Sequence, residues 1–66
     1  MTEAEKRQAQ FLEAARWWRE VVQCFPGPGA QPEWIAEWSK SLLSAETAVR
    51  TAIFAWLTSL DAQEAG

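Results

Sequence analysis

Two runs of hydrophobic residues with helical spacing lie on either side of a stretch rich in proline and glycine. In the first run, apolar residues recur in steps of three and four between Phe11 and Phe25. In the second run, the same spacing continues from Trp34 to Leu60. Such spacing places apolar side chains on one face of an α-helix, and neither run shows the alternation that is typical of a strand. The pattern therefore predicts an all-α chain with two amphipathic helices.

Capping signals predict where these helices begin and end. Thr2, followed by Glu5 three residues later, fits a capping box at the start of a first helix over about residues 3–25. Prolines and glycines in residues 26–31 predict a turn, because proline lacks a backbone donor and glycine ends helices. A proline at its first position favours a second helix over about residues 32–61.

The short turn and the wide apolar faces together predict a dimer. A turn of this length makes the helices antiparallel neighbours, so residues 1–66 are expected to form a single helical-hairpin domain. Each helix then has one partner, although its apolar face is wide enough for two. Cys24 is the single cysteine, which excludes a disulfide within the chain. We therefore expect two hairpins to form a four-helix bundle with twofold symmetry.

The large apolar residues of the two faces are expected to build the core and the dimer interface. Arg7 and Gln8 interrupt the face of the first helix, so we expect its first two turns to be less buried. The expected core and interface residues are Phe11, Trp18, Val22, Trp34, Trp38, Leu42, Val49, Ile53 and Trp56.

Four further apolar residues lie beside these faces or at their edge. Leu43 and Phe54 are three turns apart on one side of the second helix, about 100–120° from the centre of its apolar face. Leu12 is similarly displaced on the first helix, and Trp17 lies at the edge of its face. A wide dimer interface would absorb all four, since single exposed apolar residues are common. Alternatively, they form a second strip that binds a partner protein, and we adopt this as the hypothesis for a partner-binding site.

The composition favours binding over catalysis. The chain has five tryptophans and no histidine. Tryptophan forms buried anchors and interface hot spots, whereas histidine is the usual general base and metal ligand. No nucleophile-and-base set, cysteine/histidine cluster or phosphate-binding glycine motif can be assembled. We therefore expect a non-enzymatic protein without a metal or cofactor.

Charge and hydropathy bear on partners and location. The net charge of −3 lacks the basic excess of nucleic-acid-binding proteins, so we expect no nucleic-acid partner. The apolar runs are far shorter than the ~20 residues that cross a bilayer, and the polar amino-terminal sequence differs from a secretory signal. We expect a cytoplasmic protein with no membrane partner. Cys24 is expected to be a small buried or half-buried hydrophobe, with a reactive or chain-linking thiol as the alternative.

The segments FLEAARWWREVV and EWSKSLLSAETAVRTAIFAWL, joined by a short break, resemble the small phage-encoded quorum-sensing antiactivators over about residues 10–58. The likeness rests on hairpin length, an aromatic residue before a valine pair, and an alanine-rich second helix that opens with tryptophan. Members of that family are helical hairpins that dimerise, bind a LuxR-type transcription factor of the bacterial host and can inhibit a pilus-assembly ATPase. The resemblance implies a dimeric inhibitor or adaptor of a host protein, and it assigns no individual site residue.

Two other function classes stay open. One is an RNA-binding hairpin dimer, whose basic face would come from Lys6, Arg7, Arg16 and Arg19. Its affinity would fall steeply with salt. The other is a structural assembly module, whose wide apolar faces would need a partner before the chain could fold cooperatively.

Overall fold

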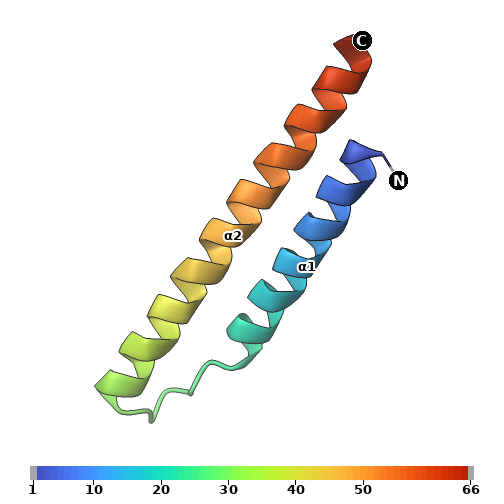
Figure 1. The fold of residues 1–66 in the computed structure, drawn as a ribbon. Helices are drawn as coiled ribbons and strands as arrows, with labels where there is room; N and C mark the ends of the chain where they lie inside the picture. Colours follow the sequence, from blue (N-terminus) through green and yellow to red (C-terminus); the bar gives the residue numbers. More distant parts are fainter. Residues whose placement is uncertain (1, 66) are drawn as a thin grey trace.

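The computed structural model of the chain describes the backbone of residues 2–65 and the side chains of residues 2–63. Helix α1 spans Glu3–Gln23 and helix α2 spans Pro32–Ala65. The two helices lie side by side and run in opposite directions (Figure 1), and the described residues contain no strand. The predicted all-α helical hairpin is therefore confirmed. α2 continues four residues beyond its predicted end, which makes the hairpin an elongated body of 53 × 15 × 12 Å.

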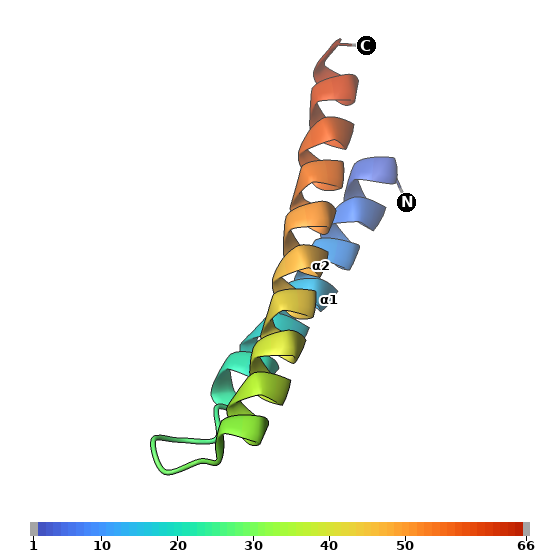
Figure 2. The same cartoon turned by 90° about the vertical axis from the view of Figure 1, so that its left-hand side faces the viewer.

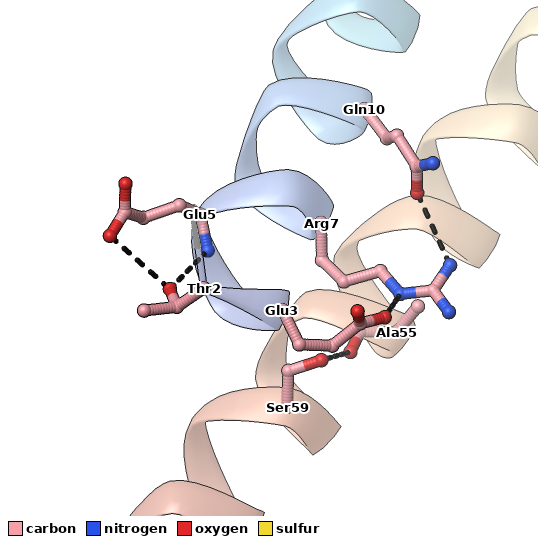
Figure 3. Close-up of polar contacts among 7 residues, drawn as sticks. All are labelled: Thr2, Glu3, Glu5, Arg7, Gln10, Ala55 and Ser59. Carbon is pink, nitrogen blue, oxygen red and sulfur yellow. Dashed lines mark hydrogen bonds and ion pairs between the residues drawn. The ribbon is translucent and has the colours of Figure 1, made fainter.

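The amino terminus of α1 is capped as the sequence predicts. The Thr2 hydroxyl oxygen accepts a hydrogen bond from the Glu5 backbone N–H at 3.1 Å. The same hydroxyl donates to the Glu5 carboxylate at 3.3 Å, as Figure 3 shows. Thr2 therefore satisfies one of the backbone donors that a helix start leaves without a partner.

The turn between the helices stops α1 and starts α2 abruptly. The Cys24 N–H donates to the carbonyls of Glu20 and Val21, both at 3.1 Å, which closes the last turn of α1. Gly27 has a φ of 94°, a conformation that L side chains rarely adopt, and its carbonyl accepts from the Ala30 N–H at 3.2 Å. The chain thereby reverses direction within a few residues.

The helices meet along a seam of residues that are alternately three and four positions apart. This spacing is that of antiparallel bundles and coiled coils, in which helices cross at a shallow angle. The crossing is visible in Figure 2. Every seam residue except Trp18 is buried or half-buried. The seam residues are Ala4, Arg7, Phe11, Ala14, Trp18 and Val21 in α1, and Ile35, Trp38, Leu42, Ala45, Val49, Ala52, Trp56 and Ser59 in α2.

Small residues are the most buried residues of the seam, and aromatic residues contribute its ring stack. Ala45 is completely buried, and Ala4 is 6% exposed. The Phe11 and Trp56 rings stack with their centroids 5.6 Å apart. The alanines thus permit close packing, while the aromatic pair contributes the larger apolar area.

The prediction that the first two turns of α1 are less buried holds for Gln8, which is exposed, but it is wrong for Ala4. Ala4 is one of the two buried hydrophobic residues, because the long α2 also covers the amino-terminal turn of α1. Arg7 does not interrupt this packing, since its stem lies half-buried while its guanidinium bonds outward. Its Nε donates to the Glu3 carboxylate at 2.8 Å and its terminal nitrogen donates to Gln10 at 3.2 Å (Figure 3).

Candidate protein-binding surfaces

The most extensive candidate sites among the described residues are apolar surfaces. They include no group of histidine, cysteine, aspartate or glutamate side chains that could hold a metal ion. They also include no buried polar or charged residue. Ten large hydrophobic side chains, in contrast, are exposed. The candidate sites on this hairpin are therefore its exposed apolar surfaces.

The residues predicted to form the core and dimer interface divide into two groups. Five of them are half-buried in the seam: Phe11, Trp38, Leu42, Val49 and Trp56. Four are exposed on the single hairpin: Trp18, Val22, Trp34 and Ile53. The contact between α1 and α2 does not bury the second group. Ser59 joins the seam although it is polar, because its hydroxyl donates to the Ala55 carbonyl of its own helix at 3.0 Å, as Figure 3 shows.

Trp38 is the residue that ties the carboxyl end of α1 to α2. Its indole Nε1 donates to the Val21 backbone carbonyl at 2.6 Å. Its ring also meets Phe25 edge-on, with centroids 4.9 Å apart. Val21 lies in the last turn of α1, and its carbonyl also accepts from the Cys24 N–H at 3.1 Å. Sequence periodicity identifies Trp38 as a core residue, but it gives no signal for this hydrogen bond.

Helix geometry separates the exposed residues onto two flanks of the hairpin. Advancing by one residue turns the side chain by about 100° in the same sense in every α-helix. In two antiparallel helices that face each other, the residues directly after seam residues therefore emerge on one flank, and those directly before seam residues emerge on the other. Five exposed apolar residues directly follow seam residues, and we call them the apolar flank: Leu12, Val22, Leu43, Ile53 and Leu57.

A hollow on α1 continues this flank. It is lined by Leu12, Ala15, Arg16, Trp18 and Arg19. Because Trp18 shares this hollow with Leu12, the exposed part of its indole lies on the side of the apolar flank. The flank thereby gains an aromatic surface beside its aliphatic residues.

The apolar flank also carries both signs of charge. Arg19, Glu46 and Arg50 each directly follow a seam residue. The ion pairs of the described side chains are instead Arg7 with Glu3 and Lys40 with Glu37. Arg19 and Glu46 are thus free to pair with another molecule.

The four residues predicted to bind a partner are all exposed, but they do not lie on one surface. Leu12 and Leu43 belong to the apolar flank. Phe54 is two residues from the nearest seam positions and therefore lies on the outer face of α2, where it is 74% exposed. It follows Leu43 by three turns, which keeps these two residues close to one line. Trp17 directly precedes a seam residue and lies on the opposite flank.

The basic residues that an RNA site would need are dispersed over the hairpin. Arg7 lies in the seam and is bonded to Glu3. Lys6 precedes a seam residue, Arg19 follows one, and Arg16 lies on the outer face of α1. Helix geometry thus distributes these four charges over different faces.

Comparison with known proteins adds no assignment: no protein-family model, curated protein or solved structure matches the chain. Across the described residues, neither helix combines the length and apolar character that crossing a membrane requires.

Proposed function

We propose that the protein is a non-enzymatic cytoplasmic regulator that dimerises as a four-helix bundle and binds another protein. In this role it acts as an inhibitor or adaptor of a bacterial host protein, such as a transcription factor. The observation that carries the proposal is the exposure of ten large hydrophobic side chains on a hairpin whose two buried hydrophobic residues are alanines.

The distribution of these side chains supports two binding events rather than one. The apolar flank, Trp17 and Trp34 on the opposite flank, and Phe54 on the outer face of α2 point in different directions. One dimer interface covers one face of a hairpin. The remaining apolar residues are then available to a partner, and exposed apolar patches commonly mark such sites.

The line formed by Leu43 and Phe54 is the proposed partner-binding strip. These are the two most exposed of the large hydrophobic residues, at 62% and 74%. Both lie on α2, the longer helix, three turns apart. An amphipathic partner that contributes a helix or a groove would bury them together. The resemblance to phage antiactivators favours a transcription factor as that partner.

The dispersed basic residues favour a protein partner over the RNA-binding alternative. A structural assembly module is the second alternative, and it predicts that the isolated chain melts without cooperativity. A single sharp unfolding transition of the purified protein would count against that alternative.

Affinity capture from a bacterial lysate tests the proposal. The tagged chain is compared with a Leu43→Ser/Phe54→Ser variant and with Ala9→Ser, an exposed position on the outer face of α1. We expect one stoichiometric protein, retained by Ala9→Ser and lost with the double variant, while the helical circular dichroism signal of all three is unchanged. Recovery of the same protein by the double variant would refute the strip. Recovery of salt-sensitive RNA would favour the alternative.

A further inference from the structure

We propose that the apolar flank binds a second copy of this chain, with the turns of both hairpins at the same end and Arg19 of each copy paired with Glu46 of the other. The inference rests on the dimer of the proposed function and specifies its interface. The interface uses Leu12, Val22, Ile53 and Leu57 of that flank. Leu43 stays with Phe54 outside the dimer, where a partner protein can reach both.

The chain exposes more surface than a folded monomer of its mass, and the excess has the size of one such interface. The accessible surface is 5083 Å² for a chain of 7.5 kDa. A folded monomer of that mass exposes about 4,200 Å². The excess of about 800 Å² equals the area that each partner contributes to an interface of standard size.

The residues of the apolar flank suit the centre of an interface. Leu12, Val22, Ile53 and Leu57 come from both helices, so a second copy placed against this flank contacts α1 and α2 together. Each of these side chains is exposed on the isolated hairpin. Their burial supplies the hydrophobic contribution that two helices alone do not provide.

The positions of Arg19 and Glu46 along the hairpin axis determine in which orientation a second copy can pair them. Phe11 stacks on Trp56, and Trp38 bonds to Val21. These contacts place Arg19 level with residues 40 to 48 of α2, a range that includes Glu46.

When the turns of both hairpins lie at the same end, residues that are level within one copy are also level between the two copies. When two hairpins pack flank to flank in that orientation, α1 of one copy lies beside α2 of the other. Arg19 then faces Glu46 of the second copy, and the twofold axis produces the pair twice. Neither residue forms an ion pair with another described side chain of its own chain, so both charges are available.

The opposite flank is a poorer surface for self-association. Glu13, Glu20 and Glu37 each directly precede a seam residue and therefore lie on that flank. A twofold dimer through it would bring glutamates from both copies together, and like charges across an interface oppose binding.

Sedimentation equilibrium tests whether the chain dimerises through the apolar flank. We expect the native chain to have twice its monomer mass at micromolar concentration. Ile53→Glu should raise the dissociation constant at least 100-fold, because it places a charge in a desolvated interface. Ala9→Glu adds the same charge on the outer face of α1 and should leave the dimer intact. An unchanged dimer with Ile53→Glu would overturn the flank assignment and leave the proposed dimer standing, whereas a monomeric native chain would overturn both.

Charge-reversal variants test whether Arg19 of one copy pairs with Glu46 of the other. Arg19→Glu and Glu46→Arg should each weaken the dimer about tenfold, because each creates two like-charge contacts per dimer. The combined variant should recover an affinity within about threefold of the native chain. Additive weakening in the combined variant would overturn the Arg19–Glu46 pairing.

Spin labels on the native Cys24 check the orientation without any substitution. Cys24 is exposed and ends α1 at the turn, so the expectation that it is buried or half-buried is wrong. With both turns at one end, the two labels lie about 20 Å apart, from the packing distances of helices in bundles. With turns at opposite ends, they are at least about 30 Å apart, from the rise along α1. The longer distance would overturn the proposed arrangement.

Discussion

The indole N–H of Trp38 donates to the backbone carbonyl of Val21, with nitrogen and oxygen 2.6 Å apart. Among the described residues this is the side-chain hydrogen bond that joins the two helices, since the others connect residues three or four positions apart. The remaining contact between α1 and α2 is apolar and lacks direction. Trp38 therefore fixes how far along α2 the end of α1 lies.

Trp38→Phe should lower the free energy of unfolding by about 1–3 kcal/mol. Phenylalanine keeps an aromatic ring in the seam but removes the indole donor, so the Val21 carbonyl accepts only from the Cys24 N–H, and some packing is also lost. Thermal denaturation followed by circular dichroism measures the effect, which corresponds to several degrees in Tm for a chain of this size. Trp34→Phe is the matched control, because Trp34 is exposed and donates no described side-chain hydrogen bond. Equal losses in the two variants would contradict the role assigned to Trp38.

Ala45→Leu should destabilise the hairpin by about 1–3 kcal/mol. Ala45 is completely buried in the seam, so a larger side chain would push the helices apart. Ala9→Leu makes the same change at an exposed position and should shift stability by less than about 0.5 kcal/mol. Urea denaturation of both variants distinguishes the two sites. If Ala45→Leu stabilised the protein, a leucine side chain would fit at residue 45, which would contradict the close packing described for the seam.

The two glycines of the turn should respond oppositely to alanine. Gly27 has a φ of 94°, so Gly27→Ala should cost about 1–2 kcal/mol through backbone strain, although open space surrounds the site. Gly29 does not have a positive φ and is equally open, so Gly29→Ala should be neutral or stabilise by up to about 1 kcal/mol. Equilibrium unfolding of both proteins checks the difference. If Gly27→Ala left the free energy of unfolding unchanged, the backbone conformation of residue 27 would not be the source of strain in the turn.

The fold could be predicted from sequence because its signals are local. Apolar spacing, the Thr2 cap and the prolines and glycines of the turn each act within a few residues. These signals alone predict the division of the chain into two helices joined by a turn. The extension of α2 beyond residue 61 was missed, because residues 62–65 add no large apolar side chain to the pattern.

The division of the apolar residues between the seam and the flanks could not be predicted in full. On a wide face, neighbouring positions such as Ala52 and Ile53 satisfy the helical period equally well, and hydrophobicity favours the isoleucine. The structure places Ala52 in the seam and exposes Ile53, because a small residue lets the helices approach. Ala4 was missed for the same reason, since an alanine beside polar residues carries a weak signal.

The exposure of the predicted partner-binding residues could be anticipated, but their grouping could not. Leu43 and Phe54 are off the helical stripe by spacing alone. Which flank Leu12 and Trp17 occupy depends on where α2 lies, and this is a property of the packed pair rather than of either helix. The proposed separation of a self-association flank from a partner-binding strip therefore needed the three-dimensional arrangement.

The cluster of Phe25 and Trp38 beside the turn has a consequence for the order in which the hairpin assembles. Bringing these two residues together closes a short loop, whereas the stack of Phe11 on Trp56 closes a loop more than three times longer. The difference in closure entropy is about 1 kcal/mol in favour of the turn end. We therefore expect folding to start at the turn and to extend along the helices from there. Substitutions near Trp38 should then slow folding, whereas those near Ala4 should accelerate unfolding.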